Sequence, residues 1–126
     1  MGIPVVKALF DTNILIDFLN GVSGAKREIE RYDQPAISLI SWMETLAGVK
    51  DSEEGKMVRG FLRHFDVRPI TEPIAEQAVR VRRDEGLRLP DAIIYATASE
   101  MGCLLVTRNT RDFSTRDPMV RVPYRV

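Results

Sequence analysis

Four carboxylates that are far apart in the sequence stand at the boundaries of predicted helices and strands: Asp11, Glu44, Asp91 and Asp112. In an open parallel sheet, strand ends and the helix starts that follow them share one crevice, so residues remote in sequence can meet there. Carboxylates gathered in one pocket repel one another unless a cation binds between them. Hard divalent ions such as Mg²⁺ and Mn²⁺ prefer oxygen ligands. The pattern therefore predicts a site for Mg²⁺ or Mn²⁺.

Asp11 is the most informative of the four. It directly follows the apolar run 5–10, which is typical of a strand buried on both faces. A carboxylate in that place lies at the mouth of the sheet, where ligands bind. The same side chain could instead cap the helix that is expected to start near Asn13. The position alone does not separate these two roles.

Glu44 and Asp91 are expected in the first turns of two helices. Ser41 and Glu44 fit a capping box, in which the acid bonds back to the start of the helix. Asp91 follows Pro90 at the start of a largely apolar helix, where the helix dipole favours a carboxylate. Capping and metal binding conflict only partly, since a first-turn carboxylate still faces the crevice.

Strands and helices alternate along the chain, which is the pattern of an α/β fold with a parallel sheet. Strands are expected at 5–10, 36–39, 67–70, 104–107 and 120–122. Helices are expected at about 13–19, 25–32, 41–48, 53–64, 72–85 and 90–100, with the charged side chains of 27–31 in solvent. The length of 126 residues and the even composition predict one domain over 1–126.

The segment after the fourth expected strand gathers several kinds of polar group. A polar loop that caps a short helical turn is the structural interpretation. The functional interpretation is that this segment completes the acidic site. Its polar side chains are Thr107, Arg108, Asn109, Thr110, Arg111 and Asp112.

The composition narrows the class of protein. The formal net charge is zero, which argues against a simple polycation, but 14 arginines stand against 4 lysines. Arginine pairs bidentately with phosphate or carboxylate, so the bias fits ordinary surface ion pairs or a surface that contacts RNA. The single cysteine, Cys103, is expected to be buried. No apolar run is long enough for a membrane span and the start does not resemble a signal peptide, so a cytoplasmic protein is expected.

Taken together, these residues resemble the PIN domain, and more closely the VapC-type toxins of toxin–antitoxin systems. The resemblance implies a single PIN-like domain whose five-stranded parallel sheet is flanked by helices. It also implies a Mg²⁺- or Mn²⁺-dependent endoribonuclease that forms a homodimer and is blocked by a cognate antitoxin protein. It covers essentially the whole chain and rests on Phe10-Asp11-Thr12-Asn13, Ser41-x-x-Glu44, Leu89-Pro90-Asp91-Ala92-Ile93-Ile94 and Thr107-Arg108-Asn109-Thr110-Arg111-Asp112-Phe113.

The resemblance gives each polar residue an expected role. A bound metal would polarise a phosphodiester, and Glu44 could orient or deprotonate a water. Many relatives carry Asp where this chain has Asn109, so Asp112 is expected to complete the site. The carboxylates expected in catalysis and metal binding are Asp11, Glu44, Asp91 and Asp112. Supporting roles fall to Thr12, Asn13, Thr107 and Asn109, and RNA contacts to Arg108 and Arg111.

Three other interpretations of the sequence compete with a nuclease. A catalytically silent PIN-like binding module would have lost one or more core acids, and none is lost here. A phosphatase of the haloacid dehalogenase type needs a second acid two positions after Asp11, where this chain has Asn13. A response-regulator receiver would need an early acidic pair and a lysine after its last strands.

Overall fold

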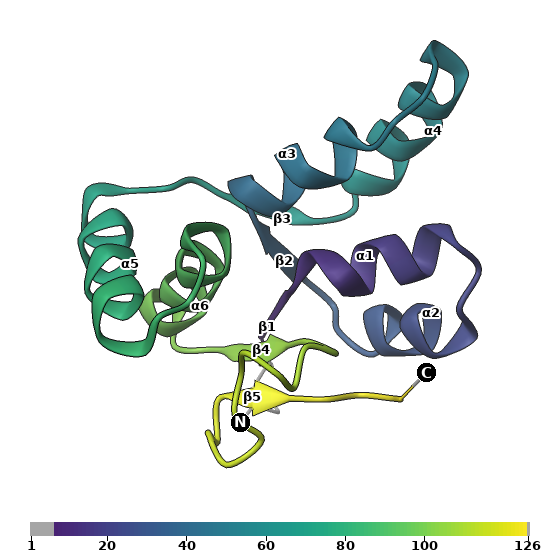
Figure 1. Ribbon diagram of the computed structural model, residues 1–126. Coiled ribbons are helices and arrows are strands. Elements are labelled where there is room, and N and C mark those ends of the chain that lie inside the picture. Colours follow the sequence, from purple (N-terminus) through teal and green to yellow (C-terminus); the bar gives the residue numbers. More distant parts are fainter. Residues whose placement is uncertain (1–6, 126) are drawn as a thin grey trace, which may run out of the picture.

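The computed structural model describes residues 7–125 and contains an all-parallel sheet of five strands in the order β3-β2-β1-β4-β5 (Figure 1). This confirms the predicted α/β fold. The first strand was expected to begin at residue 5, and that part of the prediction lies outside the described residues. The strands are short: β1 (Ala8–Phe10), β2 (Pro35–Ser38), β3 (Asp66–Arg68), β4 (Leu104–Val106) and β5 (Val120–Arg121).

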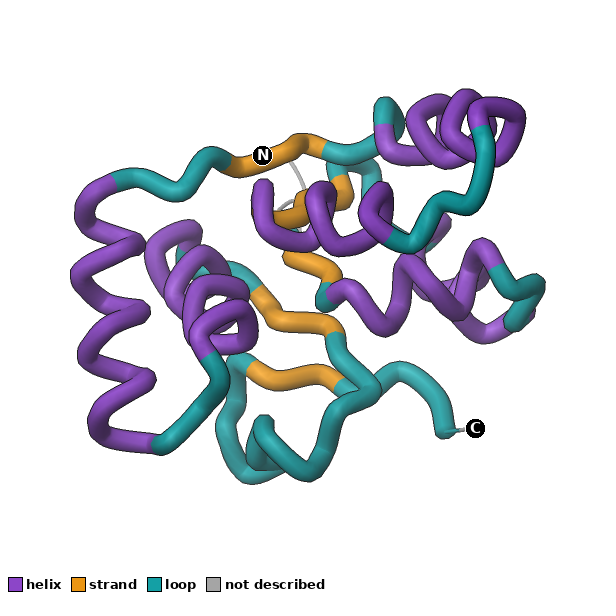
Figure 2. Tube along the Cα trace, turned by 45° about the horizontal axis from the view of Figure 1, so that its top comes forward, coloured by secondary structure: helices purple, strands orange, loops and turns teal. Residues whose placement is uncertain are grey.

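Helices cover both faces of the sheet, as the purple tubes on either side of the orange strands show in Figure 2. Successive side chains of a strand point to opposite faces. Leu9 therefore packs with α5 (Glu72–Glu85) and α6 (Leu89–Met101), whereas Ala8 and Phe10 pack with α1 (Thr12–Leu19), α2 (Ser23–Glu30) and α4 (Ser52–Leu62). Helix α3 spans Leu39–Ala47.

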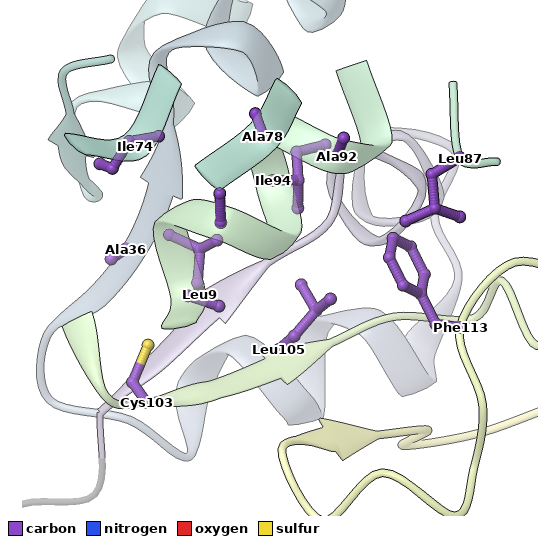
Figure 3. Close-up of a cluster of buried hydrophobic side chains, with 12 residues drawn as sticks. Leu9, Ala36, Ile74, Ala78, Leu87, Ala92, Ile94, Cys103, Leu105 and Phe113 are labelled. Carbon is purple, nitrogen blue, oxygen red and sulfur yellow. The ribbon is translucent and has the colours of Figure 1, made fainter. Parts of the chain in front are cut away.

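The core on the α5 and α6 side reaches from the sheet to the loops beside it (Figure 3). Leu9 and Leu105 lie on the sheet beneath Ile94 of α6. At one end of the cluster, Leu87 and the ring of Phe113 point toward each other. This apolar contact holds the loop before α6 against the loop after β4.

The order of the strands reverses between β1 and β4. β2 and β3 lie on one side of β1, and β4 and β5 lie on the other. A crevice opens at the carboxyl ends of the two strands that flank such a switch point. Asp11 follows β1 and Thr107 follows β4, so the fold brings together residues that are 96 positions apart.

Helix α3 begins earlier than the sequence pattern indicates. The expected capping box of Ser41 and Glu44 is wrong, because Ser38 is the capping residue and its hydroxyl accepts a hydrogen bond from the amide of Ile40 at 3.2 Å. Ser41 lies inside the helix and is fully buried. Glu44 is therefore in the second turn of α3, not the first.

The expectation that all charges of 27–31 lie in solvent is also wrong for one residue. Glu28 is 3% exposed and accepts two hydrogen bonds from Arg121, at 2.6 and 3.0 Å, and one from Tyr32. This pair ties α2 to β5. Cys103 is buried, as expected. None of the helices in residues 7–125 has the length and apolar character that a membrane crossing needs.

Candidate active site

Asp11 is both the cap of α1 and the buried centre of the site. One carboxylate oxygen accepts the amide of Thr12 at 2.7 Å, and the other accepts the hydroxyl of Thr107 at 2.7 Å and the amide group of Asn13 at 3.2 Å. The side chain is only 4% exposed. The two roles that the sequence left open for this position are therefore compatible.

Glu44 reaches the crevice from α3 through Thr12. The hydroxyl of Thr12 lies 2.8 Å from a carboxylate oxygen of Glu44 and 2.9 Å from the hydroxyl of Ser41. A carboxylate can only accept, so Thr12 donates to Glu44 and the buried Ser41 donates to Thr12. Glu44 itself is exposed. Its carboxylate thus stands beside the residue that follows Asp11.

Asp91 lies at the start of α6 with its carboxylate 9% exposed. Its only charged partner among the described residues is Arg88, whose Nε and one terminal nitrogen both lie 3.4 Å from a single oxygen. These contacts are long for charge-assisted hydrogen bonds, which are usually about 2.7–2.9 Å. The side chain of Arg88 is 79% exposed, so the pair is a loose one.

Asn109 and Asp112 bind each other in the loop after β4. The Asn109 amide donates to Asp112 at 2.8 Å, and the backbone amide of Asp112 donates to the Asn109 side-chain oxygen at 3.2 Å. The backbone amide of Asn109 also donates to Thr107 at 2.9 Å. The spacing of three residues, which predicts that the two side chains share a face, is matched by this direct contact.

Burial and mutual repulsion act on the acidic group. Burial is the main cause that raises the pKa of Asp11 to about 6; the hydrogen bond from Thr107 lowers it, and the charges of Asp91 and Glu44 raise it. Burial also raises the pKa of Asp91, with Arg88 opposing and Asp112 adding to the rise. The four predicted carboxylates are thus electrostatically linked across β1, α3, α6 and the loop after β4.

The donor set fits a hard divalent cation, since it offers carboxylate, hydroxyl and amide oxygens and no soft ligand. As the side chains stand, no three acidic, histidine or cysteine residues within 7–125 lie close enough together to hold a metal ion. Glu44 and Asp112 are exposed and bonded only to uncharged side chains, so turning toward a cation would break no ion pair. A cation would also relieve the repulsion between Asp11 and Asp91.

The sequence did not predict the buried ion pair between Asp17 and Arg108, which links α1 to the loop after β4. Arg108 donates to both carboxylate oxygens of Asp17, at 2.6 and 2.9 Å, and Tyr124 donates to Asp17 at 2.7 Å. The backbone amide of Arg108 donates to Asn13, at 3.3 Å. Arg108 was expected to contact RNA, but its guanidinium is committed to Asp17. The sequence signal was a single acid, Asp17, within the otherwise apolar stretch 14–19 of α1.

Comparison with known proteins identifies the class. The PIN domain family model matches residues 8–117, so this chain belongs to the PIN domain family. Among curated proteins it is 33% identical over 101 residues to ribonuclease VapC22 of Mycobacterium tuberculosis, covering 75% of this chain and 77% of that protein. It is 29% identical over 112 residues to ribonuclease VapC1 of Methanocaldococcus jannaschii, covering 85% of this chain and 79% of that protein.

Solved structures give the same result. A toxin–antitoxin complex from Klebsiella pneumoniae contains a chain that superposes with a TM-score of 0.88 at 46% identity, covering 94% of this chain and 99% of that one. FitAcB from Neisseria gonorrhoeae superposes with a TM-score of 0.77 at 20% identity, with 94% and 99% coverage, which supports the fold alone.

Proposed function

We propose that this chain is an endoribonuclease of the VapC type, that it hydrolyses RNA phosphodiester bonds with a divalent cation, and that it is the toxin of a toxin–antitoxin pair. Two curated relatives are named ribonucleases, and the 46% identical structure is a toxin–antitoxin complex. The observation that carries the proposal is the buried Asp11, linked electrostatically to Asp91 and Glu44 at the switch point of the sheet.

Asp11 and Asp91 are the residues that would hold the cation, Mg²⁺ or Mn²⁺, with Glu44 and Asp112 turning toward it. When bound, the ion supplies Lewis-acid polarisation of the phosphodiester and makes a bound water a better nucleophile at neutral pH. Asp11 suits this role because three donors fix its carboxylate in place. Preorganised ligands lose little freedom when the ion binds.

The remaining side chains position the reactants. Glu44 is exposed to water and can orient or accept a proton from the attacking molecule. Thr12 holds the Glu44 carboxylate, while Asn13 and Thr107 hold Asp11. In-line attack then needs no covalent intermediate on the protein.

The proposed protein partners follow from the likeness to VapC-type toxins. An antitoxin protein is proposed from the likeness to the complex from Klebsiella pneumoniae, in which a toxin and an antitoxin are bound. The homodimer is proposed from the family resemblance, and a cytoplasmic location is proposed because cellular RNA is found there. The antitoxin would act by covering the crevice between α3 and the loop after β4.

The proposal is tested by incubating the purified chain with total cellular RNA, with and without Mg²⁺ or Mn²⁺, and sequencing the new ends. We expect metal-dependent ends that disappear in Asp91→Asn. Asp84→Asn, an exposed acid of α5 that takes part in none of the ion pairs found within residues 7–125, is the matched control and should cleave as wild type does. RNA that binds but stays intact with either metal would favour a catalytically silent binding module and refute the nuclease.

A second experiment measures metal binding through the melting temperature and does not depend on RNA cleavage. A ligand that binds only the folded state raises the melting temperature by mass action. Millimolar Mn²⁺ should therefore raise the Tm of the wild type and of Asp84→Asn but not of Asp91→Asn. Calorimetry that detects no Mn²⁺ binding to the wild type would exclude Asp11 and Asp91 as the metal site.

A further inference from the structure

A cavity of about 490 Å³ opens directly beside the acidic site, where the loop before α6 faces the loop after β4. Its volume lies within the range of about 300–1,000 Å³ that is usual for small-ligand sites. The packing of Leu87 against Phe113 fixes the two loops and so fixes the walls (Figure 3). The cavity is lined by Gly86, Arg88, Asn109, Arg111 and Asp112.

The charge of this cavity differs from that of the acidic centre. Arg88 and Arg111 face it with one carboxylate, Asp112, which already accepts a hydrogen bond from Asn109. Arg111 is exposed, and the ion pairs found within residues 7–125 do not include it. A positive pocket adjoining a group of acids suits a ligand that carries its own negative charge next to a bound cation.

Arg88 is the mobile member of the pair. Its two contacts with Asp91 are 3.4 Å long and its side chain is 79% exposed, so releasing it costs little. Arg108 is the opposite case, since its bonds to Asp17 are 2.6 and 2.9 Å long and Asp17 is buried. Of the arginines around the crevice, Arg88 and Arg111 are therefore the ones available to a ligand.

We propose that Arg88 and Arg111 form a phosphate-binding subsite for the RNA strand beside Asp91, in which Arg88 exchanges the Asp91 carboxylate for a phosphate. The inference rests on the proposed function and replaces Arg108 by Arg88 as an RNA contact. A cation on Asp91 would weaken its hold on Arg88, and the freed guanidinium fork matches two phosphate oxygens. Backbone contacts of this kind position the strand without reading its sequence.

The test measures binding and not cleavage. Anisotropy of a fluorescein-labelled single-stranded RNA is recorded in EDTA at several salt concentrations for the wild type, Arg88→Ala and Arg111→Ala. Arg80→Ala, an exposed arginine of α5 outside the cavity, is the control with the same change of charge. Arg88 makes no side-chain cap at the start of α6, so its replacement should leave the fold intact.

We expect Arg88→Ala and Arg111→Ala each to weaken binding roughly two- to fivefold, the loss of one solvent-exposed charge pair. Each should also reduce the slope of log affinity against log salt by about 0.7, the value for one phosphate on a single strand. The losses should be alike for RNAs of different sequence, and Arg88→Lys should restore the slope but only part of the affinity.

Asp91→Asn gives an independent check of the exchange. Removing the charge that competes for Arg88 should strengthen RNA binding when Arg88 is present, and the gain should be smaller in the Arg88→Ala background. The subsite is wrong if Arg88→Ala and Arg80→Ala bind RNA alike, in EDTA and in a Glu44→Gln background with Mg²⁺. It is also wrong if Arg88→Ala weakens binding of a labelled polyglutamate peptide and not of RNA. A chain that binds RNA through Arg88 but cuts none keeps the subsite and loses the nuclease.

Discussion

Replacing Arg108 by alanine should destabilise the whole domain, because it leaves the buried carboxylate of Asp17 without its charged partner. Asp17 is 6% exposed and is held by two bonds from Arg108 and one from Tyr124. Removing one partner of a buried ion pair costs about 3–5 kcal/mol. The side chain of Arg108 is 32% exposed and the Tyr124 bond would remain, so we expect a smaller cost of about 2–3 kcal/mol. For a domain of this length that corresponds to a fall in Tm of roughly 8–12 °C.

The assay is urea unfolding of Arg108→Ala, Asp17→Asn and the double variant, with Arg80→Ala as an exposed control. The double variant should lose less free energy of unfolding than the two single variants combined, because Asp17→Asn leaves no buried charge without a partner. Burial raises the pKa of Asp17, but the bonds from Arg108 and Tyr124 outweigh it, so the net shift is downward.

The sign of that shift fixes the pH dependence of the pair. A lowered pKa means that the pair stabilises the folded state fully above the ordinary value of 3.8 and less as the pH falls through the lowered one. The gap between wild type and Arg108→Ala should therefore close in acid. If Arg108→Ala unfolds at the same urea concentration as Arg80→Ala at neutral pH, the buried pair does not brace the crevice.

Three further changes separate roles within the crevice. Glu44→Gln should keep the bond from Thr12 and the stability but lower RNA cleavage by about two to four orders of magnitude, the contribution of a general acid or base; an active variant at wild-type rate would refute the catalytic role. Asp112→Asn should raise the Mg²⁺ concentration for half-maximal cleavage more than Asn109→Ala does, since a carboxylate neutralises a metal and an amide does not; a titration with the reverse order would exchange the two roles. Tyr95 donates to Asp117 at 2.6 Å, and this bond raises the pKa of Tyr95 to about 12, so the stability that the bond gives should be full below pH 10 and fade as the pH rises toward 12. A difference in stability between wild type and Tyr95→Phe that stays constant up to pH 12 would contradict this.

Much of the fold follows from local signals that agree with one another. Thr71 accepts the amide of Ile74 and Gly86 closes α5 with φ of 71°, which is the left-handed conformation that glycine takes without strain. Gly102 ends α6 in the same way. Asp11 at the end of an apolar run reveals the switch point, because few other places in a parallel sheet tolerate a charge. These residues predict their structure since backbone chemistry decides it locally.

The start of α3 could not be read locally because two serines compete for it. Ser38 and Ser41 are both good caps, and Leu39 and Ile40 between them suit a strand as well as a helix. Tertiary packing decides: Ser41 is fully buried and bonded to Thr12, so its hydroxyl serves the crevice. Only the partner on α1 reveals that role, and Thr12 is 29 positions away.

The sequence alone does not distinguish an arginine that pairs with a buried acid from one that is available to RNA. A bias toward arginine fits ion pairs or RNA contacts, and the structure contains residues suited to each. Arg108 and Arg121 are bound to the buried acids Asp17 and Glu28, which lie 91 and 93 positions away and cannot be paired by spacing.

That division would allow a chain of zero net charge to offer a site to a polyanion. Arg108 and Arg121 are neutralised by the buried acids Asp17 and Glu28, and salt screens such partly buried pairs less than exposed ones. The carboxylates of the crevice would repel RNA on their own, but a bound divalent cation would cancel part of their charge at the proposed position of the phosphate. Arg88 and Arg111 add positive charge directly beside that point. The proposed RNA site thus depends on where the charges lie, and net charge is a poor guide to it.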